Sequence, residues 1–174
     1  SLLSPAIPQL RDDLMVTSDE AQLVLSAFLI MLGVGQLIAG SLSDRIGRRP
    51  VLVYGSLLFL LSGLGALFST SIEMLVAMRI FQGLGAATCM AMGRVIISDS
   101  FQRAEAGRQM STITMFQSVV PLLGFAFGGV MADLVGWRGS VGLMVVTAAI
   151  VFLGTSLLLA ESRDPSIKPV SASR

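Results

Sequence analysis

The sequence predicts an all-α membrane protein, because it is poor in charge and contains long uncharged segments. Of its 174 residues, 53% are hydrophobic and 13% are charged, against about 25% charged residues in an average soluble domain. The mean hydropathy is +0.81. A chain of this composition lacks the polar surface of a soluble domain, and we expect it to lie in a lipid bilayer.

Four segments contain no Asp, Glu, Lys or Arg, namely residues 21–43, 51–72, 109–132 and 139–160. Each exceeds the roughly 20 residues that an α-helix needs to cross the hydrocarbon core of a bilayer. A fifth apolar segment, residues 72–98, contains Arg79 and Arg94. The strands of a membrane barrel are shorter and alternate in polarity, so these continuous segments favour helices. We predict a bundle of five intact transmembrane helices within residues 11–160.

The two ends of the chain differ from this bundle. Residues 1–10 contain Pro5 and Pro8 but no basic residue, so we do not expect this segment to be a signal peptide. We interpret them as the end of a first helix whose body is missing. Residues 161–174 are polar and contain Pro165 and Pro169, and they are interpreted as the start of a cytoplasmic linker.

The basic residues predict how the bundle is oriented. One side receives eight of them: Arg45, Arg48, Arg49, Arg103, Arg108, Arg163, Lys168 and Arg174. The other side receives only Arg11 and Arg138. Cytoplasmic loops of membrane proteins are enriched in Lys and Arg, so the loop 45–49 and the C-terminus are expected in the cytoplasm. Trp137, in the short outer turn 135–138, is expected to be an interfacial anchor.

The composition also excludes several classes of function. The formal net charge is +1, there is no His, and Cys89 is the one cysteine. A nucleic-acid partner would require a basic surface, and zinc or histidine-based catalysis would require ligands that are scarce here. We therefore expect no cofactor, no metal, no nucleic-acid partner and no enzymatic activity.

The segment 40–50, GSLSDRIGRRP, contains more than the arginines that predict the orientation of the bundle. Asp44 and Arg48 stand four residues apart, a spacing at which they can form an ion pair. Gly47 would allow a tight reversal, and Gly40 would let another helix approach closely. Pro50 suits the first turn of the next helix, where its missing N–H costs nothing.

This segment resembles the loop signature of the major facilitator superfamily, which lies between the second and third helices on the cytoplasmic side. The residues that match are Gly40, Asp44, Arg45, Gly47, Arg48 and Arg49. The resemblance implies that Asp44 stabilises the outward-open state by facing a helix end of the opposite half of the transporter. It also implies that Arg48 pairs with an acid at the cytoplasmic end of the fourth helix, a position held by Asp99.

A second motif, RIFQGLGAA, occupies residues 79–87. An arginine within a span costs about 2.5–3.5 kcal/mol, so Arg79 should face a polar interior unless it extends to the outer headgroups. Gln82 lies about one turn further along, and Gly83 and Gly85 provide a surface for close packing. The motif resembles the fourth-helix R-x-x-Q-G-x-G pattern of the superfamily, whose arginine is linked to proton transfer or substrate coupling.

The segment 119–129 is a third candidate. Pro121 removes one helical hydrogen bond and can kink the helix, while Gly124 and Gly128 form a G-x-x-x-G contact face. The segment resembles the antiporter signature of the fifth helix, but no glycine precedes Pro121. An ordinary kinked, glycine-packed helix remains the alternative.

Taken together, the chain resembles the N-terminal six-helix half of drug:proton antiporters of the Bcr/CflA type. The resemblance implies a multi-pass protein of the bacterial inner membrane, with a C-terminal half that is missing here. It implies efflux of a small apolar compound or drug by alternating access, with protons as the coupling ion. Two alternatives stay open: a truncated half-transporter with no activity of its own, and an exporter of an endogenous metabolite.

Overall fold

A computed structural model describes residues 6–100 and 103–158, which form six α-helices and no strand. The helices are α1 (Ile7–Leu14), α2 (Ser18–Ile46), α3 (Arg48–Leu67), α4 (Ile72–Ser100), α5 (Arg103–Val135) and α6 (Trp137–Leu158). Helices α2 to α6 are each long and apolar enough to cross a membrane, whereas α1 has only eight residues. The predicted all-α fold with five spans is confirmed.

The helix boundaries differ from those of the uncharged segments at two places. In each case polar residues are the cause, because they either extend a helix or favour a turn that ends it. Helix α2 begins at Ser18, before the uncharged segment, because Thr17 and Glu20 form a capping box. The backbone N–H of Thr17 donates to the Glu20 carboxylate at 2.8 Å, and that of Glu20 donates to the Thr17 hydroxyl at 3.3 Å. Helix α3 ends at Leu67, before the predicted residue 72, where Ser and Thr residues favour a turn. The predicted linker 161–174 lies outside the described residues.

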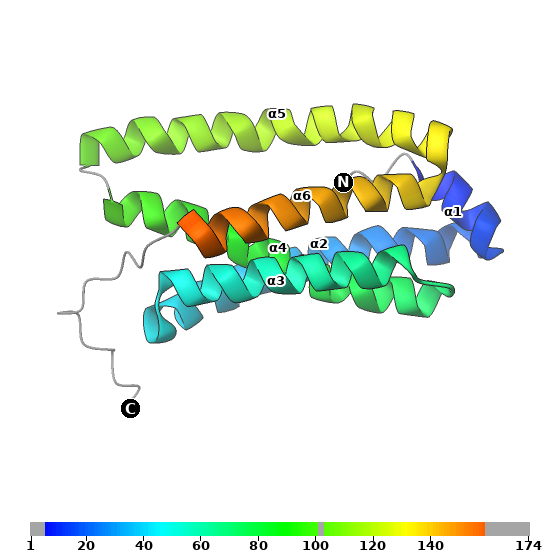
Figure 1. The fold of residues 1–174 in the computed structure, drawn as a ribbon, viewed down its shortest axis with the longest axis horizontal. Helices are drawn as coiled ribbons and strands as arrows, with labels where there is room; N and C mark the ends of the chain where they lie inside the picture. Colours follow the sequence, from blue (N-terminus) through cyan, green and yellow to red (C-terminus); the bar gives the residue numbers. More distant parts are fainter. Residues whose placement is uncertain (1–5, 101–102, 159–174) are drawn as a thin grey trace.

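The helices pack around α4, which contacts α2 on one side and α3 on the other most extensively. Helix α6 packs against α3, and α5 contacts α6 and α4. Figure 1 shows α5 running along α6 on the side away from α3. Helix α1 contacts α2 and α6, so it closes one end of the bundle.

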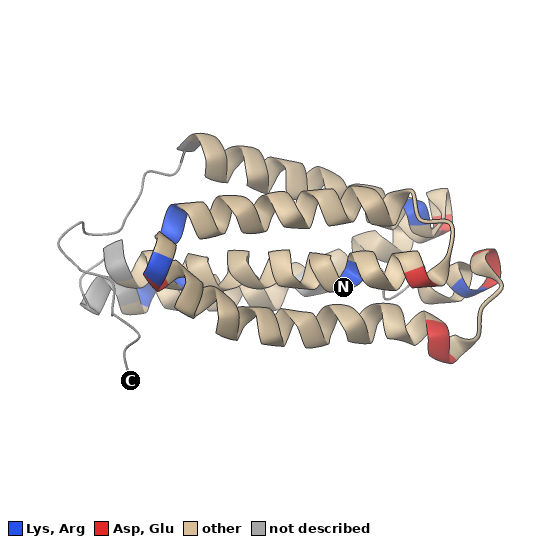
Figure 2. Cartoon of the chain, turned by 90° about the horizontal axis from the view of Figure 1, so that it is seen from below, with Lys and Arg blue, Asp and Glu red and all other residues tan. Residues whose placement is uncertain are grey.

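The charged residues lie mainly at the two ends of the bundle, as Figure 2 shows. One end, called the basic end below, carries Asp44, Arg45, Arg48, Arg49 and Arg108. The other, called the acidic end, carries Arg11, Asp12, Asp13, Asp19, Glu20, Glu73, Asp133 and Arg138. This separation is the one that a helical bundle with an apolar central band requires in a bilayer.

Candidate functional site

The turn between α2 and α3 at the basic end brings the predicted ion pair together. Gly47 has φ of +99°, a backbone conformation that residues with a Cβ rarely adopt, and it lets α3 start directly after α2. An Arg48 guanidinium nitrogen lies 3.2 Å from an Asp44 carboxylate oxygen. The same nitrogen donates to the Ser43 carbonyl oxygen at 3.1 Å. Arg48 thus stabilises the C-terminal end of α2, because it forms an ion pair with Asp44 and donates to the carbonyl oxygen of Ser43.

Arg49 and Gly40, two other residues of the loop motif, have different surroundings. Arg49 donates to the carbonyl oxygen of Ser156 at 3.1 Å, so it ties the start of α3 to the end of α6. No atom of the described residues lies within 4 Å of where a Cβ would sit on Gly40, so the close helix approach predicted there is not seen in this part of the chain. The side chain of Asp99 lies outside the described residues, and its pairing with Arg48 stays a prediction.

Arg79 lies in the interior of the bundle. Its side chain is 1% exposed, and one guanidinium nitrogen donates to the Gln82 side-chain oxygen at 2.8 Å. The guanidinium carbon lies 5.9 Å from the centre of the Phe28 ring of α2, and two nitrogens lie 3.9 Å from the sulfur of Met144 in α6. The alternative that Arg79 extends to the headgroups is therefore wrong.

Two donors of the Arg79–Gln82 pair have no acceptor in the part of the chain that the structure describes. Within the described residues, the Arg79 Nε and the Gln82 Nε2 are buried without a hydrogen-bond partner, and no carboxylate lies within ion-pair distance of Arg79. A buried cation held by a neutral amide, a thioether and a ring face is only partly compensated. The pair is thus equipped to bind an acceptor, such as a carboxylate.

Gly83 and Gly85 are confirmed as close-packing positions, and each faces a different neighbour. A Cβ on Gly83 would lie 2.6 Å from the Phe28 carbonyl oxygen of α2. A Cβ on Gly85 would lie 2.6 Å from the Phe59 nitrogen and 2.7 Å from the Gly55 oxygen of α3. These two glycines let the backbones of α2, α3 and α4 approach, which holds Arg79 in its position.

Helix α5 is continuous from Arg103 to Val135, through the position of Pro121. Gly128 is buried, and its carbonyl oxygen accepts a hydrogen bond of 2.9 Å from the Ser140 hydroxyl of α6. Gly124 is partly buried, and the side chain of Pro121 lies outside the described residues. The Gly128 contact with α6 agrees with the predicted packing face, whereas the kink stays a prediction.

The structure places Trp137 differently from the interfacial anchor that the sequence predicts. Its side chain is 1% exposed, and the indole N–H donates to the Asp13 carboxylate of the α1 helix at 3.0 Å. Arg138 stacks 4.4 Å from the Trp137 ring, lies 3.8 Å from the Asp13 carboxylate, and donates to the Ser69 carbonyl oxygen at 3.3 Å. These four residues, called the Trp137 latch, join α1, the α3–α4 loop and the start of α6 at the acidic end.

The substitution Trp137→Phe tests the latch. It keeps an aromatic ring beside Arg138 but removes the N–H that Asp13 accepts. Because water can solvate the half-exposed carboxylate, the free energy of unfolding is expected to fall by about 1–2 kcal/mol. Thermal unfolding in detergent micelles measures this change. Tyr54→Phe, at an exposed tyrosine, should leave the midpoint unchanged, and an equal midpoint for Trp137→Phe would contradict the role of the latch.

A further polar contact links α4 with α5. Arg94 donates to the Gln117 side-chain oxygen at 3.3 Å. The two residues are 23 positions apart and belong to helices that contact each other only sparsely, so no local pattern in the sequence signals the pair. Arg94 is the second arginine of α4 and is exposed within the span, and the contact gives its guanidinium a polar partner there.

Comparison with known proteins decides the family. The profile of the Major Facilitator Superfamily matches residues 1–174, the whole chain. The chain belongs to this superfamily. The structure agrees, since the chain superimposes on the proton:xylose symporter XylE of the superfamily with a TM-score of 0.67 at 19% identity, over 92% of this chain and 41% of that one. The resemblance predicted from the loop motif is confirmed.

Two bacterial drug-resistance proteins are more similar to this chain in sequence than XylE is. The chloramphenicol resistance protein of Pseudomonas aeruginosa is 32% identical over 163 residues, which cover 91% of this chain and 36% of the relative. The multidrug resistance protein D of Escherichia coli K12 is 34% identical over 170 residues, which cover 98% of this chain and 42% of the relative. The chain thus spans about two fifths of the length of these relatives and is related to secondary transporters.

Proposed function

We propose that this protein exports small, largely apolar compounds or drugs by proton-coupled alternating access. The observation that carries drug export is the identity of 32% and 34% with two bacterial drug-resistance proteins over nearly the whole chain. Alternating access in this superfamily uses two six-helix halves that rock about a central site. We infer that the described bundle acts as one such half, together with a second half of matching size.

In this proposal the basic end of the bundle faces the cytoplasm, because Lys and Arg are enriched on that side of membrane proteins. Asp44, Arg48 and Asp99 would then form the cytoplasmic gate. The observed pair of Arg48 with Asp44 supports a gate that opens and closes through charge contacts. The 71% exposure of the Asp44 side chain leaves its carboxylate accessible to a helix end of the second half.

Arg79 would couple protons to substrate. Its charge is buried, and its Nε has no acceptor among the described residues. A carboxylate that approaches this group is bound while it is ionised and released when it takes up a proton. Such an exchange would link the position of a helix to proton movement, and Gln82 would orient the guanidinium for it.

The proposal is tested with the natural full-length protein in a bacterium that lacks its own efflux pumps. Energised cells that express the protein should accumulate less of a fluorescent apolar dye than cells with an empty vector. A proton uncoupler should remove the difference. Unchanged dye levels would contradict drug export, dye export that resists the uncoupler would contradict proton drive, and export of an endogenous metabolite alone would favour that alternative.

Asp44→Asn is expected to reduce dye efflux by about tenfold, because a gate contact typically shifts a conformational equilibrium by this order. Membrane insertion should be unchanged, since the side chain is largely exposed. Initial efflux rates are normalised to the amount of protein in the membrane. Asp133→Asn makes the same chemical change at an exposed residue of the acidic end and should keep full activity. Full activity in Asp44→Asn would remove Asp44 from the gate.

A further inference from the structure

Arg94 carries a charge into the apolar part of α4. It lies within the candidate span Ile72–Ser98 and is exposed on the described bundle. One guanidinium nitrogen donates to the Gln117 side-chain oxygen of α5 at 3.3 Å. A charged side chain at membrane depth costs free energy and usually marks a site of function, so the surroundings of Arg94 indicate which ligand it serves.

The side chain of Arg94 extends toward the middle of the span and not toward the headgroups of the basic end. Helix α4 begins at the acidic end, and the Cα–Cβ bonds of an α-helix tilt toward its N-terminus. Gln117, which Arg94 contacts, lies nine residues inward from Arg108, the innermost charged residue at the basic end of α5. Nine residues of α-helix span about 14 Å. The guanidinium therefore lies at the depth of the uncharged segment of α5.

No carboxylate compensates this charge in the part of the chain that the structure describes. Arg94 forms no ion pair there, and its polar partner Gln117 is neutral. The contact leaves most N–H donors of the guanidinium unused. The neighbouring hydroxyls of Thr114 and Ser118 donate to carbonyl oxygens of α5 itself, at 2.9 and 3.0 Å, so they do not compensate the charge either. Arg94 is thus equipped to bind an anionic acceptor.

The charge of the spans strengthens this preference. Arg79 and Arg94 are the charged residues within the described spanning segments, which are residues 21–43, 51–72, 74–98, 109–132 and 139–158. These segments thus carry two positive charges and no negative charge. In the low dielectric of a membrane, a field of this sign attracts anions and opposes organic cations. The described bundle is therefore suited to a ligand with an acidic group.

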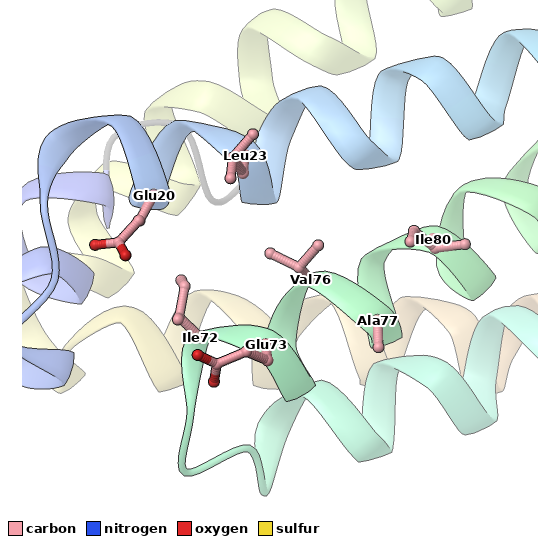
Figure 3. A pocket seen from close by; sticks show the side chains of 7 residues that line it. All are labelled: Glu20, Leu23, Ile72, Glu73, Val76, Ala77 and Ile80. Carbon is pink, nitrogen blue, oxygen red and sulfur yellow. The ribbon is translucent and has the colours of Figure 1, made fainter.

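The cavity between α2 and α4 at the acidic end, about 400 Å³ in volume, has the opposite charge (Figure 3). Its apolar lining includes Leu23, Val76 and Ile80, and the charged residues that line it are Glu20 and Glu73. An organic acid would meet two negative charges and no basic side chain there. A preference for an acid over a neutral compound therefore points to the contact of α4 with α5 and not to this cavity.

We propose that Arg94 and Gln117 bind the carboxylate of a small organic acid with a compact apolar body. Two N–H groups of the guanidinium donate to the carboxylate oxygens, a geometry that matches the planar fork of arginine. The amide nitrogen of Gln117 donates to the same carboxylate. Val120, which is exposed about one turn further along α5, contacts the apolar body. The inference deepens the proposed export function, on which it rests, because it names a class of exported compound.

The test measures equilibrium binding to the natural full-length protein in nanodiscs of phosphatidylcholine, a lipid with no net charge. The probe is 1-adamantanecarboxylic acid, which is ionised at neutral pH, and the matched neutral compound is 1-adamantanecarboxamide, with the same apolar cage. Isothermal titration calorimetry compares both compounds, with the heat of empty nanodiscs subtracted. The acid is expected to bind about tenfold more tightly than the amide, because a guanidinium–carboxylate contact is stronger than a hydrogen bond between neutral groups.

Arg94→Gln is expected to abolish this tenfold preference, because the guanidinium is lost. Gln117→Glu keeps Arg94 but gives it a permanent carboxylate partner, so it should abolish the preference as well. The control variant Arg108→Gln makes the same chemical change at an exposed arginine of the basic end and should retain the preference. Ala77→Phe, which fills the cavity between α2 and α4, and Arg79→Met should also retain it.

Three results would overturn the proposal. The first is equal affinity of the wild-type protein for the acid and the amide. The second is a preference that is lost in Arg79→Met but kept in Arg94→Gln, which would assign the acid to the interior arginine. The third is an equal loss in Arg94→Gln and Arg108→Gln, which would show that the basic end attracts acids without a site. Binding requires no proton gradient, so a failure of this test is distinguishable from a failure of dye export.

Discussion

Replacing Arg79 with Met is expected to reduce dye efflux by roughly one to two orders of magnitude while the protein stays folded. Met has a similar length but no charge and no donor, so the pair with Gln82 at 2.8 Å is lost. Removing a charge from the membrane interior favours the fold by about 2.5–3.5 kcal/mol. The buried Gln82 oxygen that loses its partner costs about 1–3 kcal/mol. The thermal midpoint in detergent should therefore be unchanged or higher.

This combination separates a functional role of Arg79 from a structural one. If Arg79 served mainly to connect α4 with α2 and α6, the midpoint of Arg79→Met would fall together with transport, and the coupling role would be rejected. Arg79→Lys keeps the charge but loses the planar guanidinium, and it should also impair efflux. Arg108→Met changes an exposed arginine of α5 at the basic end, so it should leave efflux close to that of the wild type.

Replacing Gly85 with Ala is expected to lower the free energy of unfolding by about 1–3 kcal/mol. The added Cβ would lie 2.6 Å from the Phe59 nitrogen and 2.7 Å from the Gly55 oxygen. Both atoms belong to the backbone of α3, so relief requires α3 and α4 to separate along their contact. Thermal unfolding in detergent measures the loss, and the yield of folded protein should fall in parallel.

Gly93 provides the matched control for this substitution. It lies on the same helix, and no atom of the described residues lies within 4 Å of where its Cβ would sit. Because Ala is favoured over Gly in a helix by up to about 1 kcal/mol, Gly93→Ala should leave stability unchanged or raise it. If both variants unfolded at the same temperature, the tight approach of α3 and α4 at Gly85 would not limit the stability of the bundle.

Features that depend on neighbouring residues in the chain could be predicted from the sequence. The five spans follow from uncharged segments longer than a bilayer requires. The pair of Asp44 with Arg48 follows from a spacing of four residues and is confirmed at 3.2 Å. The reversal at Gly47 follows from the conformations that glycine alone adopts readily, and its φ is +99°.

The interior position of Arg79 could be predicted from the sequence only in part. Its cost in a span predicts that it faces protein or headgroups, but the energies of the two choices are similar on a helix near the bilayer edge. The side chains that decide between them, Phe28 of α2 and Met144 of α6, are 51 and 65 positions away in the sequence. Their approach depends on how three helices pack.

Tertiary structure alone decided the features at the acidic end. Tryptophan is a residue type typical of interfacial anchors, but Trp137 is buried where α1 packs against the bundle. The same packing places the carboxylate of Asp13, 124 positions away in the sequence, beside the indole N–H of Trp137. A cavity lined in part by Glu20 and Glu73 lies between α2 and α4 at the acidic end, because these two helices pack against each other. Local patterns determine where helices begin, end and cross the membrane, since these depend on backbone conformation and hydropathy. Which polar groups meet depends on contacts between distant segments, and these carry no local signal.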